Sequence, residues 1–292
     1  MKIGIFAPLV SPTATPEFVA RLATGSEENG FASLWVTEHA VLFDDYASRY
    51  PYAENGRIPA GGRAAFLAPF STLAFLAART EKIRLGTGIC LVPQRNPVYT
   101  AKDVATVDWL SGGRVDFGIG IGWLAEEFAA LAVPFEQRAK RCSEYIEVMR
   151  RLWCDETSRY EGEFYVLPAC RQYPKPVQKP HPPIHVGGNS DAALRRVARY
   201  GDGWYGYGID PEATGERVRH LSDELERRGR AIDDIDVSVC PAENLVPDLD
   251  VVKRYRDVGV SQVVFLVAST GVEDLRVTLD ALATLVTAAA DL

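Results

Sequence analysis

Eight short apolar runs, each followed by a longer stretch of helical periodicity, constrain the fold of this chain more than any other feature of its sequence. Strand-length apolar runs that alternate with amphipathic helices are typical of βαβ units around a parallel sheet. Eight strands, each followed by a helix, are the count of a (β/α)8 TIM barrel. The predicted strands span residues 2–9, 33–38, 83–91, 114–121, 184–188, 204–207, 236–240 and 262–267. We therefore predict an α/β fold in which residues 1–292 form a single barrel domain.

The stretches between the strands carry helix start and stop signals. Thr15-Pro16-Glu17 is typical of an N-cap with proline at the first helical position, and Ser111-Gly112-Gly113 of a helix end. Two excursions interrupt the alternation, one between the second strand and Pro69, the other over residues 155–183 with a hairpin pattern at 160–165. The predicted helices span residues 15–30, from 69 onward, 97–110, a long region reaching 153, 191–200, 211–230, 249–259 and 272–290.

An open doubly wound sheet is the alternative to the barrel. Such sheets usually carry a glycine fingerprint on the first βα turn, and residues 7–12 of this chain contain no glycine. The segment Gly120-Ile121-Gly122-Trp123-Leu124-Ala125 does match G-x-G-x-x-A, but it lies on the fourth βα unit. The barrel is therefore favoured over a dinucleotide-binding fold.

Composition narrows the function classes. The net charge of −7 argues against broad binding to nucleic acid, which needs a basic face. No apolar stretch approaches 18 residues and no signal peptide precedes the first strand, so we expect no membrane partner. Five scattered cysteines without a C-x-x-C pair are typical of a reduced cytoplasmic protein. His181 and His185 lack further ligands at standard spacing, so no metal site is expected.

Glycines gather where the predicted strands end, which in a barrel is the catalytic face. Glycine there lets a flat ring or a phosphate lie directly on backbone amides. The run from Gly187 to Asp191 also precedes a helix, whose N-terminal amides bind anions. The alternative for this run is a simple turn with Asn189 or Ser190 as the helix cap. The strand-end candidates for cofactor binding are Thr87, Gly88, Ile89, Gly120, Gly122, Trp123, Gly187, Gly188, Asn189 and Trp204.

Glu38 and His39 end the second strand and are the candidate catalytic residues. A histidine at this position can transfer a proton or hydrogen-bond a ring carbonyl, although a lone histidine is often structural. Alternation along the chain directs the two side chains to opposite sides, so only one points fully into the barrel mouth. Four aromatic residues are expected to wall the mouth unless they only pack in the core: Trp123, Trp204, Tyr205 and Tyr207. Glu126 and Glu127 favour the start of a helix, where negative charge stabilises the helix dipole.

Taken together, these motifs resemble those of the luciferase-like monooxygenases over roughly residues 1–270. The chain looks most similar to the deazaflavin-dependent branch, which uses coenzyme F420 in place of FMN. The matching segments are Gly30-Phe31, Ser33-Leu34-Trp35-Val36, Glu38-His39, Arg84-Leu85-Gly86-Thr87-Gly88-Ile89, Asn96-Pro97, Ser111-Gly112-Gly113-Arg114, Gly118-Ile119-Gly120-Ile121-Gly122-Trp123, Phe135-Glu136-Gln137-Arg138, Leu152-Trp153, Pro183-Ile184-His185-Val186-Gly187-Gly188 and Gly201-Asp202-Gly203-Trp204.

The resemblance implies a non-prolyl cis peptide at Gly88-Ile89 behind the cofactor ring and a phosphate-binding backbone at Gly187 and Gly188. It also implies that His39 lies near the ring. Leu124 departs from the family pattern, which often has asparagine there, so a polar substrate contact from that position is not expected. Family members are often dimers, so a homodimer is one expectation.

Three functions follow from these observations. The leading one is an F420-dependent oxidoreductase that passes a hydride between the deazaflavin and a small organic substrate, with His39 or Glu38 moving the proton. The second is an FMN-dependent monooxygenase. The third, of a different class, is a non-catalytic carrier of the cofactor or a metabolite, which would have a closed substrate cavity.

Overall fold

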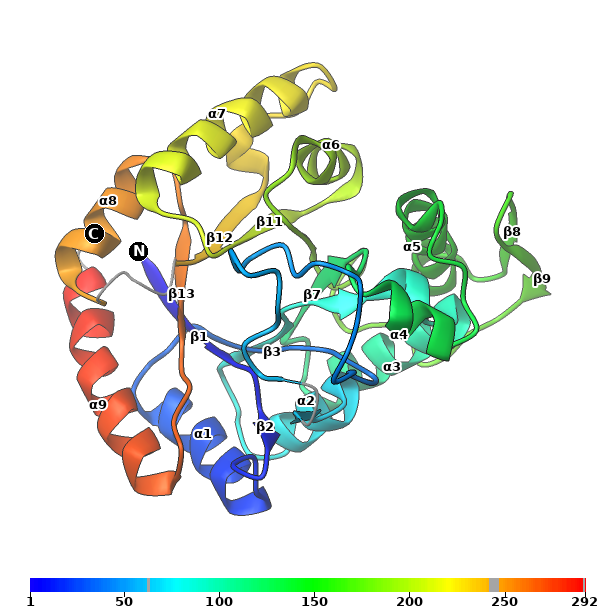
Figure 1. The fold of residues 1–292 in the computed structure, drawn as a ribbon. Coiled ribbons are helices and arrows are strands. Elements are labelled where there is room, and N and C mark those ends of the chain that lie inside the picture. The colour runs from blue at the N-terminus through cyan, green and yellow to red at the C-terminus, as the bar shows by residue number, and fades with distance from the viewer. Residues whose placement is uncertain (62–63, 242–246, 291) are drawn as a thin grey trace.

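The computed structural model describes residues 1–61, 64–241, 247–290 and 292, and its centre is a closed barrel of parallel strands (Figure 1). The strands follow one another around the barrel in chain order, and β10 pairs with β7 to close it. The barrel strands are β1 Lys2–Ala7, β3 Ser33–Val36, β5 Arg84–Thr87, β7 Val115–Gly120, β10 Ile184–Gly187, β11 Gly203–Tyr207, β12 Asp236–Cys240 and β13 Gln262–Leu266. The predicted (β/α)8 fold is confirmed.

Helices surround the strands on the outside, and the two chain ends lie close together (Figure 1). The Met1 ammonium group donates a hydrogen bond to the Ala289 carbonyl at 3.0 Å, which joins the first strand to the end of the last helix. The helices are α1 Pro16–Glu28, α2 Pro69–Ala77, α3 Pro97–Leu110, α4 Ala125–Ala130, α5 Arg138–Cys154, α6 Asp191–Tyr200, α7 Pro211–Glu226, α8 Leu249–Asp257 and α9 Val272–Ala289, with 3-10 turns η1 Val92–Gln94 and η2 Ile232–Asp234.

Capping residues begin several of these helices. The Thr15 hydroxyl accepts a hydrogen bond from the Phe18 amide at 3.2 Å, with Pro16 in the first turn of α1, as the sequence predicts. Ser190 caps α6 in the same way by accepting from Ala193 N at 3.3 Å. These caps satisfy amides that have no partner inside a helix. They also turn the chain sharply at the strand ends, which brings the loops over the barrel mouth.

Two hydrophobic clusters lie on opposite sides of the strands. The larger cluster fills the space between strands and helices, as expected for a barrel. The smaller one, Phe6, Trp35, Tyr205, Cys240 and Val264, occupies the barrel interior. Glycines make room for the indole there, since a Cβ on Gly86 would stand 2.3 Å from Trp35 Cε3. This large ring fills the barrel interior toward the amino ends of the strands, so the open space lies toward their carboxyl ends.

Two predicted elements are broken in the structure. The third strand ends at Thr87, and after Gly88 and Ile89 a short strand β6, Cys90–Leu91, pairs with β7. The long helical region predicted after the fourth strand is two helices, α4 and α5, separated by residues 131–137. Pro134 lies in that gap and Ala132 and Gln137 have φ of 55°, so helical geometry cannot continue through it.

The two predicted excursions are present. The segment after β3 crosses the strands and returns in β4, Ala65–Phe66, which pairs antiparallel with β2, Val10–Ser11 (Figure 1). The second excursion forms an antiparallel hairpin of β8, Ser158–Glu161, and β9, Val166–Cys170, so the predicted 160–165 pattern holds the end of one strand and the turn.

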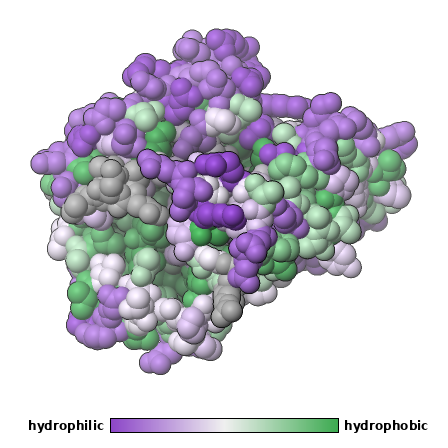
Figure 2. All heavy atoms as spheres, viewed as in Figure 1, coloured by the Kyte–Doolittle hydropathy of each residue, from purple (hydrophilic) through white to green (hydrophobic). Residues whose placement is uncertain are grey.

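Polar side chains cover α7 at the top of the molecule in the view of Figure 2. Within the described ranges, every helix is too short or too polar to cross a membrane.

Candidate active site

A cavity of about 1550 Å³ opens at the carboxyl ends of the barrel strands. Its walls come from the ends of β1, β7, β10, β11, β12 and β13, from the turn after β5, and from the excursion that follows β3. Most ligand pockets measure roughly 300–1,000 Å³, so this space is large enough for a ring cofactor and a second small molecule. The position matches the catalytic face of a barrel.

The turn after β5 forms one wall of the cavity. The peptide bond between Gly88 and Ile89 is cis, as the resemblance implies. The Ile89 side chain lies where side chains on two neighbouring glycines would otherwise stand. A Cβ on Gly120 would come within 2.0 Å of Ile89 Cδ1, and one on Gly187 within 2.9 Å of the same atom. Glycine at 120 and 187 therefore lets Ile89 form a smooth bulge facing the cavity.

The turn from Gly187 to Ser190 lies at the end of β10 and lines the same cavity. Gly188 has a φ of 107°, a backbone conformation that side chains disfavour. The Asn189 side chain is tied to the end of β11, since its Nδ2 donates to the Tyr207 carbonyl at 2.7 Å and its Oδ1 accepts from Tyr207 N at 3.2 Å. The turn is thereby held open at the N-terminus of α6, where backbone amides favour an anion.

Two arginines, Arg138 of α5 and Arg196 of α6, line the cavity beside this turn. Arg138 donates from Nε to the Gly122 carbonyl at 3.0 Å and stacks on Phe135 with its Cζ 3.8 Å from the ring centroid. Burial and the neighbouring cation Arg196 lower the pKa of Arg138. Neither guanidinium forms an ion pair with any carboxylate of the described residues, so an anionic group bound here would relieve their repulsion.

His39 and Glu127 form a hydrogen-bonded pair at the cavity wall. His39 Nδ1 lies 3.1 Å from Glu127 Oε2, and Glu127 is fully buried. Burial alone would raise the pKa of Glu127, but hydrogen bonds from His39, Gln94 and the Ala40 amide outweigh it and lower that pKa. The carboxylate is therefore charged and accepts a hydrogen bond from Nδ1–H, which leaves the second ring nitrogen, Nε2, to other partners. Nε2 has no hydrogen bond to any of the described residues, and His39 lines the cavity.

Glu38 is held more tightly. Its Oε2 accepts from the Leu91 amide at 2.6 Å, and its Oε1 pairs with Arg95 Nη1. Both oxygens are thus engaged, although the residue contributes to the cavity lining. The strand β3 ends at Val36, so these two residues lie just beyond it, and the expected alternation does not place them on opposite sides, because both line the cavity. Of the two, His39 is the one with a side-chain atom, Nε2, that is not hydrogen-bonded to a described residue.

The carboxylates of α4 also fasten the excursion that carries His39. Glu127 Oε1 accepts from the amides of Ala40 at 2.6 Å and Val41 at 3.3 Å. Glu126 Oε1 accepts from those of Ala47 at 2.6 Å and Ser48 at 3.2 Å. The sequence interpretation of these two residues as helix-start carboxylates is correct for their position in α4, but it missed their contacts with a loop 78 to 88 residues earlier in the chain.

Eight of the ten strand-end candidates for cofactor binding line the cavity, and two do not. Trp204 points outward between β11 and the helices and donates from Nε1 to the Gly188 carbonyl at 2.9 Å. Thr87 is fully buried and its hydroxyl donates to the Gly118 carbonyl at 2.6 Å. Alternation along each strand explains both, since their neighbours Tyr205 and Gly88 face the cavity instead. The expected aromatic wall consists of Trp123, Tyr205 and Tyr207 without Trp204.

Sequence reasoning missed three residues that line or support the site, namely Glu127, Arg138 and Arg196. Arg138 lies in the quoted motif Phe135-Glu136-Gln137-Arg138, which was a signal for it. Arg196 is one of several arginines in the helix after the glycine turn, and spacing alone does not indicate which of them faces inward. Tyr205 adds a buried hydroxyl at the cavity floor with no hydrogen-bond partner among the described residues.

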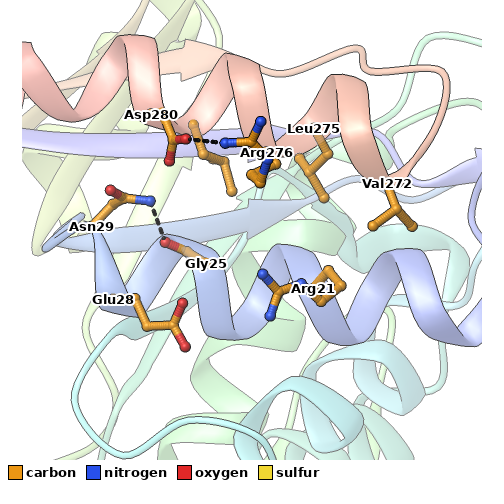
Figure 3. A pocket seen from close by; sticks show the side chains of 9 residues that line it. Arg21, Gly25, Glu28, Asn29, Val272, Leu275, Arg276 and Asp280 are labelled. Atoms are coloured by element: carbon orange, nitrogen blue, oxygen red, sulfur yellow. Dashed lines mark hydrogen bonds and ion pairs between the residues drawn. The ribbon is translucent and has the colours of Figure 1, made fainter.

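A second, small cavity of about 50 Å³ lies between α1 and α9 on the outside of the barrel (Figure 3). Its lining includes an ion pair between Arg276 and Asp280 at 2.8 Å and the hydrogen bond from Asn29 Nδ2 to the Gly25 carbonyl at 3.0 Å. It has room for only a few water molecules and does not reach the barrel mouth. Among the described residues no group of three or more His, Cys, Asp or Glu side chains is arranged to hold a metal ion.

Comparisons with known proteins agree with this geometry. The profile of the luciferase-like monooxygenase family matches residues 1–243. The uncharacterized protein Rv0953c of Mycobacterium tuberculosis is 33% identical over 270 residues, covering 92% of this chain and 93% of that one. An FMNH2-dependent dimethylsulfone monooxygenase of Pseudomonas putida is 31% identical over 160 residues, covering 54% of this chain and 44% of the relative.

Solved structures with the same fold include a monooxygenase and an F420-dependent enzyme. The monooxygenase RslO1 of Streptomyces bottropensis superposes with a TM-score of 0.79 at 25% identity, covering 98% of this chain and 99% of that one. The coenzyme F420-dependent tetrahydromethanopterin reductase of Methanopyrus kandleri superposes with a TM-score of 0.73 at 19% identity, covering 95% and 97%. Relatives of this chain therefore use either F420 or FMN.

Proposed function

Because the chain belongs to the luciferase-like monooxygenase family, an enzyme family, we propose that it uses coenzyme F420 to transfer a hydride to or from a small organic substrate. The observation that supports a phosphate-bearing cofactor is the pair Arg138 and Arg196, which line the cavity without an acidic partner among the described residues, and the choice of F420 over FMN rests on the resemblance of the sequence motifs to the deazaflavin-dependent branch. Such an arrangement suits the phosphate of a cofactor rather than a neutral ligand.

The residues around the turn fit this group in shape as well as in charge. A Cβ on Gly188 would stand 3.4 Å from Ala193 Cβ and would fill the space above the first amides of α6. The Ile89 bulge and the glycines at 120 and 187 offer a flat surface against which a ring can lie. In this proposal Thr87 and Trp204 do not contact the cofactor. They stabilise the cavity wall through hydrogen bonds to the Gly118 and Gly188 carbonyls.

A deazaflavin held here would supply hydride-transfer chemistry, because carbon in place of the flavin N5 disfavours oxygen activation. His39 provides the matching proton. When a substrate is reduced, Nε2 gives a proton to the substrate heteroatom as its carbon gains the hydride, and in the reverse direction Nε2 takes that proton back. Glu127 holds the ring so that Nε2 faces the cavity. Glu38, paired with Arg95, remains a secondary candidate.

The FMN-dependent monooxygenase is the second candidate, and the similarity to the dimethylsulfone monooxygenase and to RslO1 favours it. The non-catalytic carrier is set aside, because the family is one of enzymes and the cavity leaves room for a substrate.

Titration of the purified protein with F420 and with FMN, followed by fluorescence, tests the proposal. We expect F420 to bind at least tenfold more tightly, a difference of about 1.4 kcal/mol. Equal or inverted affinities would remove the deazaflavin assignment in favour of the monooxygenase. Single turnover of bound reduced F420 with an organic acceptor, measured in the absence of oxygen, would then separate hydride transfer from oxygen chemistry.

A further inference from the structure

Six aromatic rings that line the cavity form a connected chain around its mouth, which we call the aromatic girdle. They come from the end of β1, the excursion after β3, the turn after β7 and the end of β11. The members of the girdle are Phe6, His39, Tyr50, Tyr52, Trp123 and Tyr207. Four chain segments that are far apart in sequence thus supply one continuous aromatic surface.

Each ring of the girdle contacts the next edge to face. From His39 the ring centroids are 6.0 Å apart to Trp123, and then 5.2 Å from Trp123 to Tyr50. Tyr50 lies 5.5 Å from Tyr52, which lies 5.0 Å from Tyr207. Tyr207 completes the series at 5.8 Å from Phe6. Edge-to-face packing fixes the orientation of every ring, so the surface is preorganised before a ligand arrives.

The girdle is not sealed within the core. Tyr52 is 39% exposed, and all members except Phe6 remain partly accessible. Apolar surface that remains open inside a concave cavity is typical of a binding wall, because a ligand that covers it releases water.

The charged side chains of the cavity lie at its exposed rim, in an ion pair, or beside the glycine turn. Arg49 and Glu54 are exposed at the rim, where Arg49 Nη2 donates to the Glu54 carbonyl at 3.0 Å. Glu38 is bound to Arg95, and Arg138 lies beside the phosphate turn with Arg196. The aromatic rings themselves supply no opposite charge, so a charged substrate group held against them would lose its hydration without compensation from the rings.

We infer that the substrate is a neutral molecule with a planar or cyclic apolar body, held by the aromatic girdle beside the cofactor. This inference rests on the proposed function, and it adds the class of molecule that accepts or gives the hydride. The rings would stack on the apolar body and His39, itself a member of the girdle, would place Nε2 at the reacting polar group. Such a substrate carries a carbonyl, an alcohol or an imine at the reacting carbon, where hydride and proton are added or removed together.

Binding of matched probes to the cofactor-loaded protein tests this class. The probes are 2-naphthol, 2-naphthoate, 2-naphthyltrimethylammonium and the linear 1-decanol, measured by calorimetry at neutral pH. We expect 2-naphthol to bind at least tenfold more tightly than each of the other three. Equal or tighter binding of either charged probe would overturn neutrality, equal binding of 1-decanol would overturn ring selection, and no binding of 2-naphthol would overturn the inference altogether.

Two substitutions within the girdle test whether its rings bind 2-naphthol. Tyr52→Leu and Tyr207→Leu should each weaken 2-naphthol binding by about fivefold, the size of one lost aromatic contact. Tyr99→Leu is the matched control, because Tyr99 is 74% exposed on α3 and does not line the cavity. Equal effects of all three would contradict the assignment. Cofactor titration of the wild type, together with 2-naphthol binding to the cofactor-free protein, separates the two ideas: 2-naphthol binding by a protein that binds neither F420 nor FMN would remove the proposed function alone.

Discussion

The two ends of the barrel each carry a histidine beside a buried carboxylate, and the pairs are built differently. Near the amino ends of the strands, His185 Nε2 lies 3.6 Å from Asp116 Oδ1, and the imidazole packs edge to face on Trp35 with ring centroids 5.3 Å apart. At the carboxyl ends, His39 Nδ1 lies 3.1 Å from Glu127 and the ring faces the cavity. The lower histidine is enclosed, whereas the upper one has a nitrogen available to a ligand.

The arginines repeat this contrast. At the lower end Arg84 donates from Nε and Nη2 to Asp116, and its charge is neutralised inside the protein. At the upper end Arg138 and Arg196 lack such a partner among the described residues. The same side-chain types therefore stabilise the barrel at one end, and at the other end they remain available to a ligand. This agrees with the division of labour between the two faces of TIM barrels.

The most direct test of the difference between the two ends of the barrel is to replace each histidine. His39→Ala should keep the fold and most of the cofactor affinity but lose on the order of 10²-fold or more in turnover, the usual size of a general acid–base contribution. His185→Leu, at the enclosed pair, should lower the free energy of unfolding and leave the turnover of the folded protein close to that of the wild type. Single-turnover rates, cofactor dissociation constants and urea unfolding should be measured on both variants. If the bound complex of His39→Ala turns over at the wild-type rate, His39 only packs against the ring.

The unpaired arginines are tested next. Arg196→Met should raise the cofactor dissociation constant by about 10- to 100-fold, since a charge-assisted hydrogen bond contributes about 1.5–3 kcal/mol. The salt dependence of binding should fall along with the affinity, because one cation no longer attracts the phosphate. Arg84→Met is the control from the other end of the barrel and should reduce stability without changing cofactor affinity. Unaltered binding to Arg196→Met would place the phosphate elsewhere in the cavity.

The contrast between the two ends also explains how much the sequence could predict. The number of strands predicted the barrel. The glycines at the strand ends predicted that Gly88, Ile89, Gly187 and Gly188 lie at its mouth, because the carboxyl ends of parallel strands all lie on one face. Local patterns carry this information, since each glycine lies directly at the end of its own strand. The mouth of the barrel was thus predictable from residues that are close in sequence to the site.

Two kinds of residue could not be predicted in this way. Trp204 was expected in the mouth, but the side-chain period in a strand is two, so an error of one residue in phase moves a side chain to the other face. Glu127 and Arg196 reach the site from helices, and their role depends on which helix face turns toward a loop far away in sequence. No local motif in a single sequence shows which face of a helix turns toward the site.

A third test addresses the lower end through pH. Burial alone would raise the pKa of Asp116, but His185 and Arg84 outweigh it and lower that pKa below its value in the unfolded chain. The stability from this shift is therefore present above the unfolded pKa of about 3.9 and is lost as the pH falls toward the folded value. Asp116→Asn should reduce the free energy of unfolding at pH 7 by about 1–3 kcal/mol, less than for a fully buried pair, because Arg84 is partly exposed.

Urea unfolding of Asp116→Asn and the wild type at several pH values between 7 and 3 measures this effect. The gap between the two proteins should shrink below about pH 4, where the Asp116 carboxylate of the unfolded wild-type chain begins to gain its proton while the folded protein still holds it charged. Asp250→Asn is the control, since Asp250 forms only an exposed pair with Lys253 and should show almost no gap at any pH. A gap for Asp116→Asn that stays constant down to pH 3 would mean that lost packing, and not charge, causes the difference.

The smallest expected effect sharpens the comparison at the upper end. Glu127→Gln keeps the shape of the side chain and an oxygen for the Ala40 amide, but it removes the negative charge beside His39. We expect turnover to fall by about tenfold, the lower end of what orienting a general acid contributes. Without the carboxylate, Nδ1 of His39 loses the partner that orients the ring, so the loss should fall on turnover, and the cofactor dissociation constant should stay close to that of the wild type. Glu126→Gln is the matched control, because Glu126 fastens the same excursion at Ala47 and Ser48 without touching His39. If both variants lose the same activity and the same cofactor affinity, Glu127 serves only to anchor the loop that carries His39.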